Sequence, residues 1–254
     1  MRVRRSSPVP AWSFKLSLLL VLTPSAMPQM ANGIFVTSVP DIPFIALSEL
    51  ESTYIKPDGA SVSGKATRAI ARDSKGRIFK EGRRLEPITE SAPSLLILID
   101  IYEPQTKTYT FLYPPFRTFW KGTLERPPLL IADEYFYGWA TRDGMPAYRF
   151  AKEEALGTQT IDGMTVRGVR ETQEVIDESG KKIVTTGEYW YSDDLHMNLV
   201  ATINGPDKSS LTVRVTQVNR IEPDATIFEI PSNYTRTETP IPRALSDLKD
   251  GIGQ

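Results

Sequence analysis

Apolar and polar residues alternate along most of this chain with a period of two, the spacing of a half-buried β-strand. The clearest example is LHMNLVATINGPDKSSLTVRVT, residues 195–216. The turn-forming residues 204–207 interrupt an otherwise regular series of apolar positions: Leu195, Met197, Leu199, Ala201, Ile203, Leu211, Val213 and Val215. This stretch therefore predicts two strands joined as a hairpin, the second running to about Ile221.

The same period recurs upstream and predicts further strands within residues 61–73, 77–87, 94–104, 106–114, 157–161, 164–176 and 181–194. Residues 73–77 (DSKGR) and the dipeptide Asp162–Gly163 have the composition of tight hairpin turns. The continuous apolar run in 94–104 is typical of a central strand buried on both faces. Strands in this order, without long helices between them, predict a mainly β (α+β) fold. We expect a curved antiparallel sheet or half-open β-barrel with short helices packed against it.

Two segments interrupt the period of two and suggest short helices. The first lies between Pro43 and Pro57, with Ser48 and the apolar spacing as its support. The second is expected around Ala147–Ala155, after a proline-rich region that prevents any long element.

The two ends of the chain differ in composition from its centre. Four basic residues precede an apolar run at 16–22, and small residues follow at Ser25 and Ala26. This pattern indicates a secretory signal peptide over residues 1–31, cleaved after Ala26 or Ala31, with an uncleaved interfacial N-terminus as the alternative. A single β-rich domain is expected over 32–234, followed by a polar tail over 235–254. The expected location is periplasmic or secreted.

Charge and cysteine content narrow the possible functions. The formal charge is −1, and removal of residues 1–31 takes away four positive charges to leave −5. Nucleic acid is therefore not an expected partner. The chain has no cysteine, which excludes thiolate metal sites, a cysteine nucleophile and a lipid-modified N-terminal cysteine.

The single histidine is the first candidate for catalysis. If residues 195–203 form a strand, His196 shares a face with Asn198 and Val200, opposite the apolar set. This face is either solvated, with His196 as an exposed surface residue, or the lining of a concavity. A general base oriented by Asp193 or Asp194 would need a nucleophile, but the segment GASVSG at 59–64 lacks the spacing of a nucleophile elbow. The acidic pairs lack the spacing of a calcium loop. We therefore assign no catalytic residue, no metal ligand and no cofactor, and expect a protein that is not an enzyme.

A basic hairpin is one of two regional biases. Residues 65–84 carry eight basic and two acidic side chains, a local charge of +6. Such a segment can bind an anionic head group or membrane surface, with Arg83 and Arg84 as the expected contacts. The alternative is a solvated strand face whose charges pair with acids elsewhere.

The second bias is aromatic. Twelve of the 24 aromatic residues fall within the 42 positions 109–150. They either fill the core or line an apolar pocket, which is the usual composition of a small-molecule site. The predicted ligand-binding residues of such a pocket are Phe111, Tyr113, Phe116, Phe119 and Trp120, together with Arg83 and Arg84.

Three motifs resemble a known family. In order they are Gly157–Gly163 within LGTQTIDG, Trp190–Asp194 within EYWYSDD, and Asp224–Pro231 within EPDATIFEIP; the segment RAIARDSKGRIFKE precedes them. This series resembles the outer-membrane lipoprotein carrier family and its RseB-like and LppX-like relatives. A proline usual in the second motif is missing at Met197–Asn198. The resemblance implies a half-open β-barrel whose concave apolar face holds acyl chains.

Together these features predict a non-enzymatic binding protein of the cell envelope. It would carry or sense a lipid or lipoprotein acyl chain in an apolar concavity, next to an anionic membrane surface or an envelope protein. The alternative is a structural or protein-interaction module without a small ligand, which would use a sheet edge or the basic face.

Overall fold

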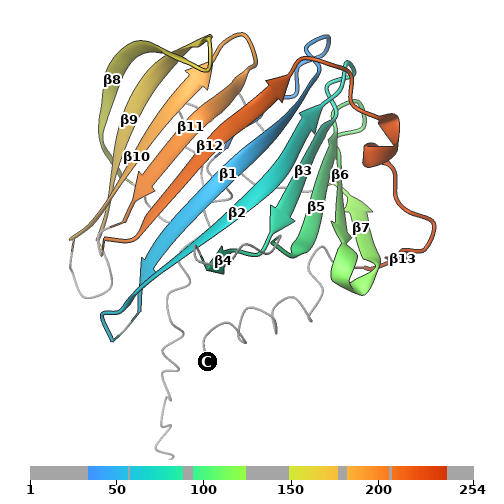
Figure 1. The fold of residues 1–254 in the computed structure, drawn as a ribbon, viewed down its shortest axis with the longest axis horizontal. Helices are drawn as coiled ribbons and strands as arrows, with labels where there is room; N and C mark the ends of the chain where they lie inside the picture. Colours follow the sequence, from blue (N-terminus) through green and yellow to red (C-terminus); the bar gives the residue numbers. More distant parts are fainter. Residues whose placement is uncertain are drawn as a thin grey trace, which may run out of the picture.

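The computed structural model describes residues 34–56, 58–87, 94–123, 149–176, 182–205 and 208–238. Thirteen strands form one open, strongly curved sheet (Figure 1). The strands are β1 (Phe44–Ile55), β2 (Ser61–Arg72), β3 (Ile78–Arg83), β4 (Glu86–Pro87), β5 (Leu96–Glu103), β6 (Thr108–Tyr113), β7 (Thr118–Gly122), β8 (Arg149–Ile161), β9 (Met164–Ile176), β10 (Lys182–Ser192), β11 (Met197–Asn204), β12 (Ser210–Asn219) and β13 (Thr235–Arg236).

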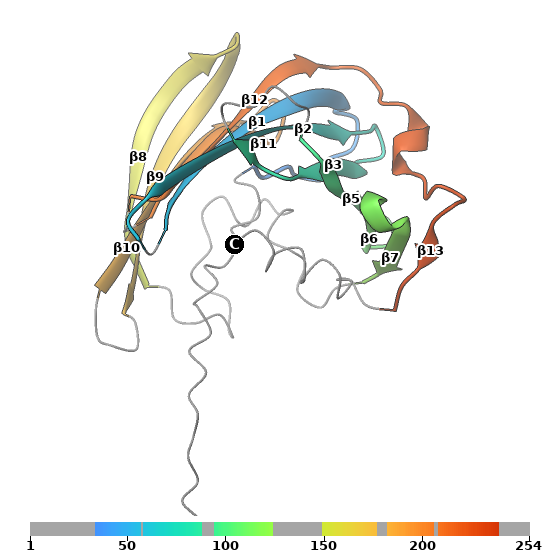
Figure 2. The ribbon, with the colours of Figure 1, turned by 60° about the horizontal axis from the view of Figure 1, so that its bottom comes forward.

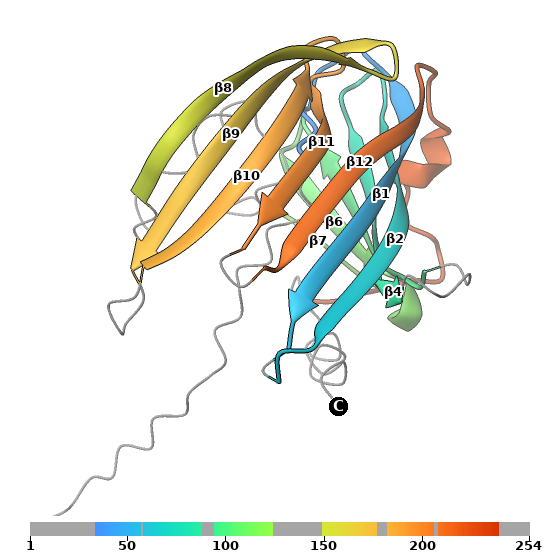
Figure 3. The ribbon, with the colours of Figure 1, turned by 60° about the vertical axis from the view of Figure 1, so that its left-hand side comes forward.

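The sheet has the order β13-β7-β6-β5-β3-β2-β1-β12-β11-β10-β9-β8, with β4 beside β2. All pairs are antiparallel except β7 and β13, which are parallel. The long-range pairing of β1 with β12 joins the two halves of the chain into one layer. Figure 3 shows the second half, β8–β12, in front, ending at the edge strand β8. The predicted mainly β fold is confirmed, and the sheet remains open.

Helix is nearly absent from the described residues, which contain the 3₁₀ turns η1 (Pro114–Phe116) and η3 (Ala225–Phe228). In this part of the chain no helix is long and apolar enough to cross a bilayer. The expected signal peptide and most of the polar tail lie outside the described residues.

Both predicted short helices are wrong within the described residues. The segment after Pro43 is strand β1, in which Phe44, Ala46, Ser48 and Leu50 are buried with a period of two. It has backbone partners on both sides, β2 and β12, and these outweigh weak local helix signals. The segment from Arg149 onward is β8, which the turn at Asp162 pairs with β9.

The two predicted turns are confirmed. In the β2–β3 turn the Asp73 carboxylate accepts hydrogen bonds from the backbone N–H of Lys75 (3.0 Å) and Arg77 (2.7 Å), and Gly76 has φ +78°. In the β8–β9 turn Asp162 and Gly163 have φ of 49° and 78°. Left-handed conformations at both central residues match the twist of a two-residue hairpin, which explains the choice of Asp-Gly.

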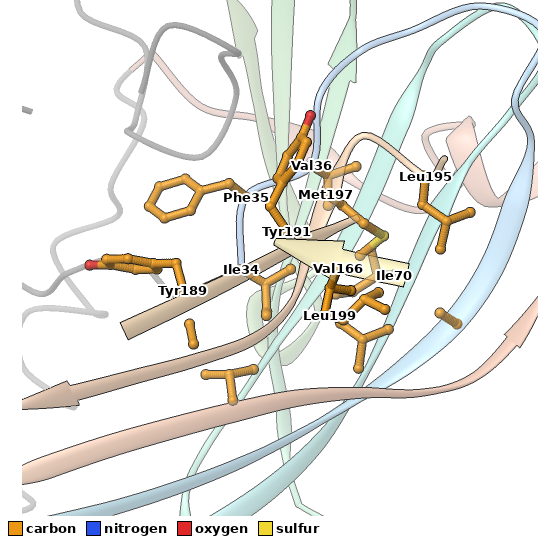
Figure 4. Packing of buried hydrophobic residues seen from close by; sticks show 14 of the residues in the cluster. Ile34, Phe35, Val36, Ile70, Val166, Tyr189, Tyr191, Leu195, Met197 and Leu199 are labelled. Carbon is orange, nitrogen blue, oxygen red and sulfur yellow. The ribbon is translucent and has the colours of Figure 1, made fainter. Parts of the chain in front are cut away.

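The main hydrophobic cluster lies on the concave face of the sheet. The segment ahead of β1 runs inside the curve (Figure 2) and contributes Ile34, Phe35 and Val36. Figure 4 shows these side chains against residues of β2, β9, β10 and β11 and of the β10–β11 turn: Ile70, Val166, Tyr189, Tyr191, Leu195, Met197 and Leu199. A second cluster on the opposite face joins Ala71, Phe79, Ile101 and Leu112 to Phe228 of η3.

Arg72 fixes the segment ahead of β1 in this position. Its fully buried guanidinium donates to the carbonyl oxygens of Thr37 (2.6 Å), Ile42 (2.9 Å) and Leu195 (2.8 Å). It also lies 5.0 Å from the centroid of the Phe44 ring. One side chain thus ties three distant parts of the chain together.

Candidate functional site

His196 lies in the β10–β11 turn with φ 49°, not within a strand as predicted. Asn198 and Val200 are both buried, so the face that they were predicted to share with His196 is not a solvated one. The segment ahead of β1 pairs with this end of β11: Thr37 N–H donates to the His196 carbonyl (2.9 Å) and Asn198 N–H to that of Phe35 (3.1 Å).

The acids next to this histidine have other partners. Asp193 forms an ion pair with Arg167 (3.1 Å) and Asp194 with Arg220 (3.6 Å). Among the described residues, no three histidine, aspartate or glutamate side chains come together to hold a metal ion. His196 therefore lies in a turn that is stabilised by a backbone hydrogen bond from Thr37 and flanked by two ion-paired acids.

Aromatic side chains form a continuous row across β5, β6 and β7. Tyr102 lies opposite Tyr109, and Phe111 lies opposite Trp120. The ring centroids are 4.8 Å apart for Tyr102–Tyr109, 6.2 Å for Tyr109–Phe111 and 5.6 Å for the stacked pair Phe111–Trp120. We call these four residues the aromatic row. The strand register places them on the same face as Ile70 of the concave cluster.

Trp120 is held flat against the sheet by a glycine. A Cβ atom built on Gly122 would lie 2.8 Å from the Trp120 ring, so any larger residue would displace the indole. Residues two apart in a strand share a face, and a glycine there gives the neighbouring ring room to lie down. The indole is only half buried, which leaves this end of the aromatic row accessible.

The predicted ligand-binding aromatics are only partly brought together. Phe111, Tyr113 and Trp120 share the face of the aromatic row. Phe119 lies on the opposite face, against the cluster that contains Leu112 and Phe228. Phe116 is 36% exposed in η1. The aromatics of 124–148 lie outside the described residues, and ligand binding by the five remains a prediction.

A buried charged pair lies beside the aromatic row, and composition gave no sign of it. Lys80 on β3 faces Asp100 on β5, which in turn faces Phe111 on β6, and both charged side chains are buried. Burial lowers the pKa of Lys80 to about 8, although Asp100 opposes the shift. Burial raises the pKa of Asp100 to about 6, against the charge of Lys80. The pair is a polar element within an otherwise apolar surface.

A cavity of about 510 Å³ opens at the end of the aromatic row. Its lining within the described residues is Trp120, Arg236, Thr237 and Glu238. Strand β13 and the residue after it hold this wall against β7. Thr237 N–H donates to the Phe119 carbonyl (2.7 Å) and the Arg236 guanidinium to that of Lys121 (3.2 Å). The cavity is open to solvent, and three of these four lining residues are polar.

The basic hairpin does not present one continuous charged face. Arg68, Arg72 and Lys80 are buried. Arg83 donates to Glu81 (2.7 Å) and to the Ser94 carbonyl (2.8 Å), whereas Arg84 pairs with Glu86 (3.0 Å) and is half exposed. Both partners are acids two residues away, and this spacing places side chains on the same side of an extended chain.

Comparisons with known proteins give weak similarities only. No protein-family model and no curated protein matches the chain. LprF from Mycobacterium bovis is 11% identical over 76% of this chain and 90% of its own, with a TM-score of 0.32. The lipoprotein LppX from Mycobacterium tuberculosis is 14% identical over 71% and 88%, with a TM-score of 0.28. A putative outer membrane lipoprotein-sorting protein domain from Vibrio parahaemolyticus is 10% identical over 73% and 88%, with a TM-score of 0.19.

All three identities are below 15% and all three TM-scores are below 0.5. The function proposed for this chain therefore rests on its own residues.

Proposed function

We propose that this protein binds an apolar chain, such as the acyl chain of a lipid or lipoprotein, on the concave side of its sheet. The observation that carries the proposal is the aromatic row, which ends at a half-buried Trp120 in the wall of an open cavity of about 510 Å³. Stacked rings offer a large apolar contact area, and burial of such area drives binding. No bond is made or broken, and the role is that of a carrier or sensor in the cell envelope.

The polar groups near the cavity set the orientation of the ligand. Arg236 and Glu238 line its wall beside Trp120 and provide one charge of each sign. Polar groups in a binding site fix the orientation of the ligand and give specificity. Arg84 is exposed, as are Lys65 and Lys75 of the same hairpin, and although it pairs with Glu86 it is our proposed contact for an anionic membrane surface. Arg83 is less exposed and is engaged by Glu81 and Ser94.

The alternative, a module that binds a partner strand at a sheet edge, is less well supported. The edge strand β8 carries two register shifts, one between Phe150 and Lys152 and one between Ala155 and Gly157. Gly157 has φ +81°, and the charged residues Lys152, Glu153 and Glu154 lie between the two irregularities. Bulges and charges of this kind are features that prevent edge-to-edge pairing.

The test uses brominated palmitate, which quenches tryptophan fluorescence only at close range. Two single-tryptophan proteins are compared, with the other three tryptophans replaced by phenylalanine. One retains Trp120, and the matched control retains Trp190, whose ring lies over Gly168 in strand β9. We expect saturable quenching of Trp120 and no quenching of Trp190, because Trp190 lies on β10, eight strand-to-strand steps from β7 in the sheet.

Two results would refute the proposal. One is the absence of saturable quenching of Trp120, together with no palmitate in organic extracts of the protein purified from its own envelope. The other is equal quenching of both tryptophans, which would indicate nonspecific adsorption.

A further inference from the structure

A buried glutamate lies near the other end of the sheet, on the strand next to the edge strand β8. Glu171 on β9 is 1% exposed, and among the residues that the structure describes neither of its carboxylate oxygens has a hydrogen-bond partner. Burial raises its pKa to about 7, and the charge of Glu153 adds to the shift. An unpaired carboxylate costs several kcal/mol to bury, on the order of the whole stability of a domain. Such a group is retained only where something compensates it or where the site is used.

Glu153 lies directly opposite Glu171 in the β8–β9 pair, on the same face. Its side chain is exposed, in contrast to that of Glu171. Directly opposed residues of an antiparallel pair have Cβ atoms about 5 Å apart, and like charges there repel one another. The pair thus combines a buried carboxylate with a second one at the surface, and a cation between them would relieve both the repulsion and the missing hydrogen bonds.

Aromatic side chains border the same carboxylate. The residue opposite Glu171 on β10 is Gly187, and a Cβ built on this glycine would lie 2.6 Å from the Tyr189 hydroxyl oxygen. The phenol ring therefore lies over the glycine, next to Glu171. The ring of Phe35 lies 5.9 Å from that of Tyr189. Burial and the charge of Glu171 both raise the pKa of Tyr189, so this phenol stays neutral.

We propose that Glu171 and Glu153 bind the ammonium group of an alkylamine, with Tyr189 and Phe35 contacting its carbon chain. The surroundings favour an organic ammonium over a metal ion. Two carboxylates are few ligands for Ca²⁺, which takes six to eight oxygen atoms. Faces of aromatic rings attract weakly hydrated organic cations. The negative charge of both glutamates excludes a fatty acid carboxylate from this position.

This site is separate from the cavity at Trp120. Trp120 lies on β7, and in the sheet order β9 and β7 are nine strand-to-strand steps apart, which at ~4.8 Å per step is about 43 Å along the sheet. The inference is therefore independent of acyl-chain binding at the aromatic row, and the two can fail separately.

The test compares octylammonium with 1-octanol at pH 8 by isothermal titration calorimetry. The two probes have the same alkyl chain, but octylammonium carries a positive charge and 1-octanol is neutral. A hydrogen bond to a charged group contributes about 1.5–3 kcal/mol, and 1.4 kcal/mol is tenfold in affinity, so we expect octylammonium to bind at least tenfold more tightly. Glu171→Gln should abolish this preference. The matched control is Glu174→Gln, three residues along β9 on the opposite face and ion-paired with Lys182, and it should retain the preference.

Further measurements keep the test decisive. Glu153→Gln should reduce the preference for octylammonium over 1-octanol. This second variant tests the site if the Glu171 variant fails to fold. Lowering the pH to 5.5 should weaken octylammonium binding to the wild type, since Glu171 takes up a proton; Glu153 and Tyr189 are the other titratable groups on this face of the neighbouring strands. Equal binding of both probes would overturn the proposal, as would unchanged preference in the Glu171 variant. Displacement of octylammonium by 1 mM Ca²⁺ would also overturn it, in favour of a metal site.

Discussion

Replacement of Arg72 by methionine should destabilise the protein more than any surface change. Arg72 is fully buried and donates three hydrogen bonds, of 2.6, 2.8 and 2.9 Å, to carbonyl oxygens of the segment ahead of β1 and of the β10–β11 turn. Methionine keeps the length and packing of the stem but leaves Thr37, Ile42 and Leu195 without their donor.

The expected cost follows from those three bonds. A hydrogen bond to a charged group contributes about 1.5–3 kcal/mol, so three of them amount to about 4.5 kcal/mol or more. The cost of desolvating the guanidinium offsets part of this gain. We therefore expect Arg72→Met to lower the free energy of unfolding by about 4 kcal/mol. Arg72→Lys keeps the charge but lacks the planar guanidinium group. Its free energy of unfolding should therefore lie between those of the wild type and Arg72→Met.

Urea denaturation followed by circular dichroism measures this effect. With a denaturant slope of ~2 kcal/mol per M, a loss of about 4 kcal/mol lowers the midpoint by about 2 M. Arg214→Met is the control, because this arginine is exposed in β12 and its loss should change stability by less than about 0.5 kcal/mol. A loss below about 1 kcal/mol for Arg72→Met would refute the view that this side chain anchors the segment ahead of β1.

Three further predictions concern other parts of the sheet. Gly168→Ala would place a Cβ 2.5 Å from the Trp190 ring and should cost about 1–3 kcal/mol in thermal denaturation; an equal cost in a Trp190→Leu background would rule out this clash as the cause. Asp73→Ala removes the acceptor of two turn N–H groups and the ion pair with Arg77, and should cost about 2 kcal/mol; a loss no larger than that of the exposed Ser74→Ala would contradict this account of the turn. Glu171 has a pKa of about 7 in the folded protein and 4.5 ordinarily, so the folded state holds the extra proton and stability should fall as pH rises from about 4.5 to about 7. Urea midpoints of Glu171→Gln should show a smaller fall over this range, and a fall as steep as that of the wild type would contradict the assignment.

Residues within one strand were predictable from the sequence. The period of two places Tyr109, Phe111 and Tyr113 on one face of β6, and the structure confirms this. The turns at Asp73 and Asp162 followed from residue types that tolerate the required backbone angles. These features depend on neighbours in the chain, and one sequence contains all the information they need.

Relations between strands were not predictable in the same way. The pairing of β1 with β12 converts the predicted helix after Pro43 into a central strand, because partners on both sides supply the backbone hydrogen bonds. The buried pair Lys80 and Asp100 likewise depends on the pairing of β3 with β5.

The sequence by itself therefore determined that the chain is mainly β, where most strands lie and which faces they present. Only the tertiary structure decided which strands are neighbours, and with this the composition of both proposed sites. Strand order places Trp120 beside Phe111, Asp100 beside Lys80 and Glu153 opposite Glu171. The physical reason is that a side chain's partners across a sheet come from register and strand order. These are set by burial of the whole surface, and many pairings of strands with similar alternation satisfy the local pattern equally well.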